Sequence, residues 1–184
     1  MKTEVTELRT EAVYSDDGEK RYLLRKTWEE GKSKLAIIML SPSVADGIQL
    51  DITTQLVVNN ASRLGYGSVA IVNLSAVLND YNLNHTEEDA ENIKVILEEA
   101  NNAEKIIYAP GTGKARNKSF MCLQKRVLLA LQDYEDKLHL VEKFMTIREK
   151  VQKIDELLDG YEPDRAQHIV EDIRRISDEI IEEL

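Results

Sequence analysis

Three apolar runs of this chain, residues 35–40, 69–72 and 106–109, each stop abruptly at small polar residues. Those polar residues are Ser41, Pro42 and Ser43 after the first run, Asn73 and Ser75 after the second, and Gly111, Thr112, Gly113 and Lys114 after the third. A carboxamide offers a donor and an acceptor side by side, so Asn73 could read the edge of a base-like ring. The alternative is that Asn73 bonds only to backbone at the end of a strand.

The loop after the third run combines glycine with positive charge. Two glycines let backbone N–H groups approach an anion, a helix is expected to follow, and the three cations Lys114, Arg116 and Lys118 lie within five residues. The loop does not match the Walker phosphate-binding pattern, because Tyr108 and Ala115 stand where that pattern needs Gly and Ser or Thr. We expect this loop to contact a phosphate or another anion. The alternative is a solvated loop.

Two acids flank the turn between the first run and a helix expected at residues 51–64. Asp51 is placed to cap that helix by accepting a hydrogen bond from the amide of Thr53 or Thr54. Asp46 has no such structural role. It is therefore the candidate for contacting a ribose hydroxyl or, if the protein is an enzyme, for activating water.

Metal and thiol chemistry are not indicated. The three histidines are too scattered in the sequence for ligand spacing, so no metal site is predicted. The single cysteine, Cys122, cannot form an internal disulfide. Because it lies in an apolar helical stretch, we interpret it as a buried, inert thiol.

The apolar runs are expected to be buried strands of one parallel sheet, because an apolar run bounded by a turn signal suits a strand covered on both faces. Open α/β sheets bind ligands at the carboxyl ends of such strands. Periodic apolar positions predict helices at residues 51–64, 87–101 and 117–132. Thr86 is the expected N-cap of the second helix, and residues 137–141 are the expected last strand.

Two further elements complete the predicted fold. Residues 11–14 and 21–28 flank an Asp-Gly turn and predict an N-terminal β-hairpin. Residues 142–159 and 164–184 are helical by periodicity. The second of these helices carries a near-heptad stripe of Ile169, Ile173, Ile176, Ile180 and Leu184. The sequence thus predicts an α/β three-layer sandwich with a mainly parallel sheet, an N-terminal hairpin and a C-terminal two-helix appendage.

Two domains are expected on this basis. Residues 1–141 would form an α/β domain that contains the ligand pocket. Residues 142–184 would form a helical hairpin. That hairpin would either cap its own sheet or join two copies of the chain in a homodimer.

The distribution of charge favours a small anionic ligand over a long nucleic acid. The chain has 184 residues and a net charge of −10, yet residues 106–132 contain five Lys or Arg and no acid. Duplex binding usually requires a broad basic face, so binding of nucleic acid is the less favoured interpretation. No apolar run approaches 18 residues and no signal-peptide pattern is visible, which predicts a cytoplasmic protein without a membrane span.

Four stretches carry a family resemblance: RYLLRKTWEE, IIMLSPSVADG, LDITTQ and ASRLGYGSVAIVNLSA, in this order. They resemble the bacterial and phage family called domain of unknown function 1643. The resemblance covers residues 20–141, and the tail after Val141 lies outside it. The chain departs from the family pattern at Ser41, Val44, Ile52 and Ser75, where the family has Asn, Thr, Pro and Phe. The closing HPLY-type motif of the family is also absent, since LHLVEKF stands in its place.

The order of the polar turns is also similar to that of the uracil-DNA glycosylase superfamily. This resemblance implies that the turn at residues 41–43 positions water and that Asn73 reads a base edge. The His-Pro segment that stabilises the departing base in those enzymes has no counterpart here. His139 lies within the expected last strand and is not followed by Pro.

The resulting hypothesis is non-catalytic binding of a small phosphorylated nucleotide-type ligand, such as sequestration of a host signal by a phage anti-defence protein. The expected ligand contacts are Ser41, Pro42, Ser43, Asp46, Asn73, Ser75, Gly111, Thr112, Gly113, Lys114, Arg116 and Lys118. The first alternative is a glycosidase-like or glycosylase-like hydrolase in which Asp46 activates water. The second is a protein-interaction module that acts through the helical tail. No cofactor or metal is predicted.

Overall fold

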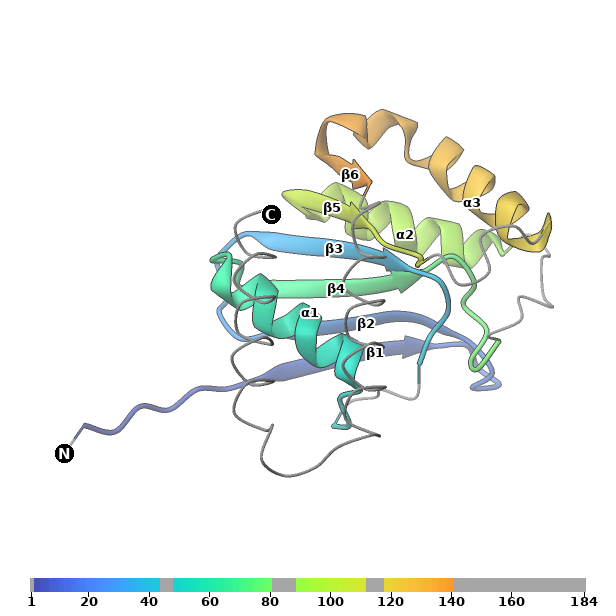
Figure 1. Ribbon diagram of the computed structural model, residues 1–184. Coiled ribbons are helices and arrows are strands. Elements are labelled where there is room, and N and C mark those ends of the chain that lie inside the picture. Colours follow the sequence, from blue (N-terminus) through green and yellow to red (C-terminus); the bar gives the residue numbers. More distant parts are fainter. Residues whose placement is uncertain (1, 44–47, 81–88, 112–117, 141–184) are drawn as a thin grey trace, which may run out of the picture. The chain divides into compact units, whose positions relative to one another are not determined.

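A computed structural model of the chain describes residues 2–43, 48–80, 89–111 and 118–140. The predicted two-helix appendage at residues 142–184 lies outside the described residues. So do five of the predicted ligand contacts, namely Asp46, Thr112, Gly113, Lys114 and Arg116. The described residues contain a mixed six-stranded sheet with helices packed against it (Figure 1).

The strand order across the sheet is β1-β2-β4-β3-β5-β6. The strands are β1 (Arg9–Tyr14), β2 (Arg21–Thr27), β3 (Lys34–Met39), β4 (Ser68–Asn73), β5 (Lys105–Tyr108) and β6 (Leu138–Leu140). The three apolar runs of the sequence form β3, β4 and β5. They lie side by side and pair in parallel, as predicted. Their core positions are buried, with Val69 and Ile106 at 0% exposure.

The N-terminal hairpin joins the sheet instead of standing apart from it. β1 pairs antiparallel with β2, and β2 pairs antiparallel with β4. The expectation of a mainly parallel sheet therefore describes only the part formed by β3, β4, β5 and β6. The physical reason is that the short connection between β2 and β3 reverses the chain, and β4 runs parallel to β3, so β2 meets β4 in the opposite direction.

Helices cover both faces of the sheet in the described part of the chain. They are α1 (Ile52–Arg63), α2 (Ala90–Asn102), α3 (Lys118–Ala130) and the short 3₁₀ helix η1 (Gln132–Lys137). Because neighbouring side chains of a strand point to opposite faces, Ile37 packs on the α1 side and Ile38 on the α2 and α3 side. No helix among the described residues is long and apolar enough to cross a membrane.

The helix caps confirm one prediction and correct another. Asp51 caps α1, and its carboxylate accepts a hydrogen bond from the Thr54 amide at 2.6 Å. The prediction that Thr86 caps the next helix is wrong. α2 begins at Ala90, and its N-cap is Asp89, whose carboxylate accepts from the Asn92 amide at 3.1 Å. A local Asp three residues before an amide is as good a cap as Thr.

The prediction that Cys122 is buried is also wrong. Cys122 is exposed, and its neighbour Met121 is 58% exposed. The core face of α3 is formed instead by Phe120, Leu123 and Val127, which follow helical spacing. The apolar residues around Cys122 therefore occupy more of the helix circumference than the sheet can cover.

Gly67 lies where β4 enters the sheet beside the end of β2. Its amide donates to the Ser33 carbonyl at 2.9 Å, and its own carbonyl accepts from the amides of Trp28 and Glu29, each at 3.0 Å. A Cβ at this position would lie 2.1 Å from the Glu29 carbonyl oxygen. Close approach of two backbone segments therefore requires glycine here.

We expect Gly67→Ala to lower the free energy of unfolding by about 1–3 kcal/mol, because the added methyl group overpacks a backbone contact. Urea titration followed by circular dichroism measures this loss. Ser62→Ala, at an exposed position of α1, is the control and should change the free energy by less than about 0.5 kcal/mol. Equal stability of Gly67→Ala and the wild type would contradict the close approach.

Candidate functional site

The chain segments that follow β3, β4 and β5 meet at one edge of the sheet. In the strand register, Met39 lies opposite Asn73, and Ile38 lies opposite Tyr108. Beyond β4 the pairing continues, since the Ser75 amide donates to the Leu40 carbonyl at 3.0 Å. Polar residues far apart in the sequence are thereby brought to the carboxyl edge, where α/β sheets hold ligands.

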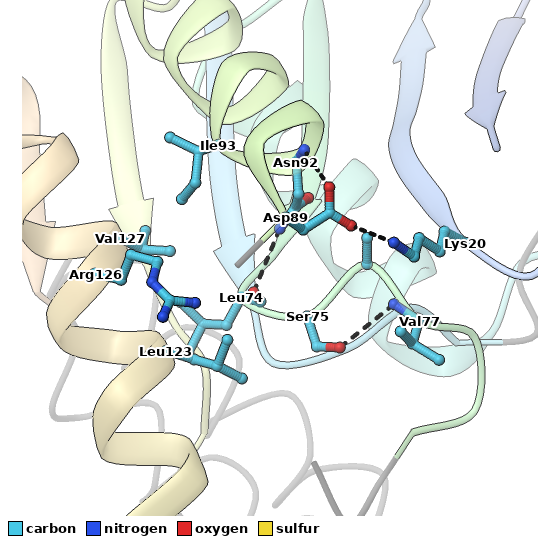
Figure 2. A pocket seen from close by; sticks show the side chains of 11 residues that line it. Lys20, Leu74, Ser75, Val77, Asp89, Asn92, Ile93, Leu123, Arg126 and Val127 are labelled. Carbon is cyan, nitrogen blue, oxygen red and sulfur yellow. Dashed lines mark hydrogen bonds and ion pairs between the residues drawn. The ribbon is translucent and has the colours of Figure 1, made fainter. Parts of the chain in front are cut away.

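A pocket of about 120 Å³ opens beside the end of β4 (Figure 2). Its walls come from the hairpin, the segment after β4, the first turn of α2, and α3. The lining residues are Lys20, Leu74, Ser75, Ala76, Val77, Asp89, Asn92, Ile93, Leu123, Arg126 and Val127. Of the predicted ligand contacts within the described residues, Ser75 is the one that lines it. Its hydroxyl oxygen accepts a hydrogen bond from the Val77 amide at 3.3 Å.

Asn73 lies behind the pocket wall instead of in it. Its side chain is buried, and its backbone carbonyl accepts a hydrogen bond from the Asn92 side chain at 3.0 Å. Its own side-chain oxygen Oδ1 is buried and accepts no hydrogen bond from the described residues. A buried acceptor of this kind calls for a donor, so Asn73 keeps its place as a candidate contact that a ligand or water would satisfy.

Asn92 positions the pocket, although the sequence patterns did not single it out. Its Nδ2 donates to the carbonyls of Asn73 and Leu74 at 3.0 and 3.3 Å. These two bonds fasten the first turn of α2 to the segment after β4. The residue is 2% exposed. The one local pattern that involves Asn92 is its position three residues after the N-cap Asp89. That spacing predicts the start of a helix but does not indicate a hydrogen-bond partner on β4.

The wall of the pocket carries charges of both signs. The Lys20 ammonium donates to the Asp89 carboxylate at 2.8 Å, and this hydrogen bond raises the pKa of Lys20 above its ordinary value. Lys20 and Asp89 are 69 residues apart in the sequence, so no motif could pair them. Arg126 reaches the pocket from α3 (Figure 2). Arg126 belongs to residues 106–132, which contain no acid. That run of positive charge is the sequence feature that could have indicated a role for Arg126 in binding an anion.

A second polar cluster lies at the same edge of the sheet, where three motifs of the sequence converge. Arg21, from the RYLLR stretch, is 2% exposed, and its Nη1 donates to the Ser43 carbonyl at 3.4 Å. Ser43, from the SPS turn, forms a side-chain hydrogen bond with Asp51, from the LDIT stretch. The cluster therefore joins β2, the turn after β3 and the start of α1.

Burial alone would raise the pKa of Asp51. Hydrogen bonds from Ser43 and from the amide and hydroxyl of Thr54, together with the positive charge of Arg21, outweigh that effect, so the pKa lies below its ordinary value of 3.8. Each of these groups stabilises the ionised carboxylate. Asp51 and Ser43 therefore have a structural role at the edge of the sheet.

The other predicted contacts are at this edge or outside the described residues. Pro42 is buried and Ser41 is partly buried in the turn after β3. Gly111 follows β5 with a φ of 75°, a left-handed conformation that favours glycine. Lys118 is the first residue of α3. Among the described residues, no group of three or more His, Cys, Asp or Glu side chains could hold a metal ion.

Comparison with protein-family models gives a match over residues 21–177, to the model described as "Protein of unknown function (DUF1643)". The match continues past Val141, so the resemblance, which was placed over residues 20–141, was drawn too short. Neither the curated proteins nor the solved structures gave a match. The similarity to uracil-DNA glycosylases therefore stays a prediction.

We expect Asn92→Ala to lower the free energy of unfolding by about 1–3 kcal/mol, because two backbone carbonyls lose their donor. Chemical denaturation measures the loss. Asn101→Ala, at an exposed position of the same helix, is the matched control and should have little effect. Similar losses in both variants would show that the Asn92 bonds do not fasten α2 to β4.

Asp51→Asn should make stability less sensitive to acid. A carboxyl group with a lowered pKa stabilises the fold above its ordinary pKa of 3.8, and this contribution is lost as pH falls through the lower folded value. The wild type should therefore be more stable than Asp51→Asn at pH 6, and the difference should shrink below about pH 4. Urea titrations between pH 3 and 6 test this.

Glu98→Gln, at an exposed position of α2, serves as the control for the pH series. A difference between wild type and Asp51→Asn that stays constant with pH would contradict the charge-based role of Asp51.

Proposed function

The chain belongs to the family described as proteins of unknown function (DUF1643), and from its site we propose that it binds, without transforming it, a small phosphorylated nucleotide-type ligand. The ligand would lie at the carboxyl edge of the sheet. The biological role that we propose is sequestration, such as removal of a host nucleotide signal by a phage protein.

One observation carries this proposal: two cationic side chains from distant segments meet at a pocket beside the end of β4. Lys20 comes from the hairpin and Arg126 from α3, and the pocket lies between them (Figure 2). Ser75 adds a hydroxyl group to the same wall. Positive charge beside hydrogen-bonding groups is the chemistry that recognises a phosphate.

The size of the pocket limits which part of the ligand it holds. The pocket has a volume of about 120 Å³. Sites for ligands of drug size are usually about 300–1,000 Å³. The described pocket therefore suits one phosphate group, and the sugar and base would extend along the sheet edge toward Ser41.

Binding is favoured over hydrolysis by the state of the acid in the pocket. Asp89 accepts hydrogen bonds from the Lys20 ammonium and from the Asn92 amide. Because each oxygen of this carboxylate already accepts a hydrogen bond, the group is poorly placed to take a proton from water. Asp46, the acid proposed for a hydrolase, lies outside the described residues. Hydrolysis remains the alternative function, and the binding experiment tests it directly.

The test is calorimetric titration of the full chain with a panel of nucleotides that includes monophosphates, diphosphates, triphosphates and cyclic forms. Each mixture is also analysed by chromatography for breakdown products. Binding without breakdown supports sequestration, whereas release of a base or a sugar establishes the hydrolase instead. If no nucleotide binds, the proposal is wrong, and the helical tail becomes the place to look for a protein partner.

Arg126→Gln should weaken binding about 10- to 150-fold, because a charge-assisted hydrogen bond contributes about 1.5–3 kcal/mol. Lys125→Gln is the matched control. It removes the same charge from the next residue of α3, but Lys125 is exposed and does not line this pocket. Affinity of the wild type should also fall as salt rises. Equal affinities of the two variants would contradict the placement of the phosphate beside Arg126.

A further inference from the structure

The strand β1 forms an open edge of the sheet within the described part of the chain. It stands at one end of the strand order, and β2 is its one described partner (Figure 1). Proteins commonly protect such an edge with Pro, Lys or a bulge. Residues 9–14 contain neither Pro nor Lys, and the register shift against β2 lies at the far end of the strand, between Val13 and Tyr14. Most of β1 is therefore a regular strand that can pair with another.

The hydrogen bonds of β2 determine which backbone groups of β1 face this open edge. The Trp28 amide donates to the Gly67 carbonyl at 3.0 Å, toward β4. Because backbone groups alternate in direction along a strand, those of Arg25, three residues earlier, face β1. Arg25 lies opposite Glu11, so the backbone groups of Glu11 face β2. The residues on either side of Glu11 then face the open edge, and these are Thr10 and Ala12.

A second copy of the chain fits this edge by antiparallel pairing of β1 with itself. Two identical strands related by a two-fold axis pair the same residues in both directions. An axis at Thr10 places Arg9 of each copy opposite Glu11 of the other. An axis at Arg9 or at Glu11 would set that charged residue against its own copy, and an axis at Ala12 would leave both charges without a partner in the other copy. Charge complementarity therefore favours the axis at Thr10.

The two charged side chains are accessible for this contact. Arg9 pairs with Glu30 at 3.3 Å, but these side chains are 73% and 79% exposed, and an exposed pair contributes little to stability. Glu11 pairs with Arg25 and keeps 45% of its side chain exposed. Because their backbone groups face β2, Arg9 and Glu11 would meet as a non-hydrogen-bonded pair, in which cross-strand side chains are closest.

We propose that β1 is a self-association surface, at which two copies of the chain pair their β1 strands antiparallel about Thr10. The pairing joins two six-stranded sheets into one and adds about six main-chain hydrogen bonds between the copies. Leu8, which is 47% exposed, lies opposite Ala12 of the other copy and loses exposed apolar surface. Strand pairing alone buries less than the roughly 1,600 Å² of a standard interface, so the dimer should dissociate on dilution. This inference does not depend on nucleotide binding.

The first test measures the mass of the full chain by sedimentation velocity at rising concentration. The wild type should pass from one chain to two. Ala12→Pro removes an amide that faces the open edge, a position at which a strand tolerates Pro. It should raise the dissociation constant at least about tenfold, because each copy loses one hydrogen-bond donor to the other. Circular dichroism checks that the variant is folded. A wild type that stays monomeric at every concentration overturns the proposal.

Exchange of charges tests the register. Arg9→Glu alone sets acids against each other across the axis, and Glu11→Arg alone sets cations against each other. Each variant should therefore dimerise at least about fivefold more weakly than the wild type. A mixture of the two variants has opposite charges in both contacts and should form a mixed dimer. Weakening in the separate variants without association in the mixture overturns the proposed pairing.

Lys125→Glu is the matched control for Arg9→Glu. It makes the same change of charge at an exposed position of α3 and should leave the dissociation constant unchanged. A wild-type dimer that is unaffected by Ala12→Pro and by Arg9→Glu overturns the proposal and places the interface elsewhere in the chain. These two variants decide the proposal even if Glu11→Arg, which lies opposite Arg25, does not fold.

Discussion

The site depends on the two hydrogen bonds that the Asn92 carboxamide donates to the carbonyls of Asn73 and Leu74. They join the first turn of α2 to the point where β4 stops pairing as a strand. A carbonyl buried without a donor would cost about 1–3 kcal/mol, so these bonds strongly favour a single position of the helix. Once α2 is fixed there, Asp89 faces Lys20 and the pocket has its wall.

Charged side chains at the carboxyl edge fall into two groups with different roles. The cluster of Arg21, Ser43 and Asp51 is engaged within the protein and orders the turn after β3. The pair of Lys20 and Asp89 lies partly exposed at the pocket, where a ligand can reach it. Motif residues of the family therefore build the edge, while residues outside those motifs supply much of the charge of the pocket.

Local patterns explain which parts of the fold were predictable. The three buried strands and the Asp51 cap were found because each depends on a few consecutive residues. The position of the hairpin in the sheet and the exposure of Cys122 were not, because they depend on which strand or helix face meets which neighbour. Similarly, the placement of Asn73 behind the pocket wall follows from packing against Asn92.

The sequence by itself determined the strands, the helices and the edge at which polar residues gather, because apolar runs and turn residues act over short distances. Only the tertiary structure decided which side chains share a pocket. Lys20 in the hairpin and Asp89 at the start of α2 are 69 residues apart. Arg126 lies on a third element, α3. Such a meeting is set by strand order and by the way helices pack on the sheet. A contact between distant segments leaves no spacing pattern in the sequence, so only the folded structure shows which residues meet.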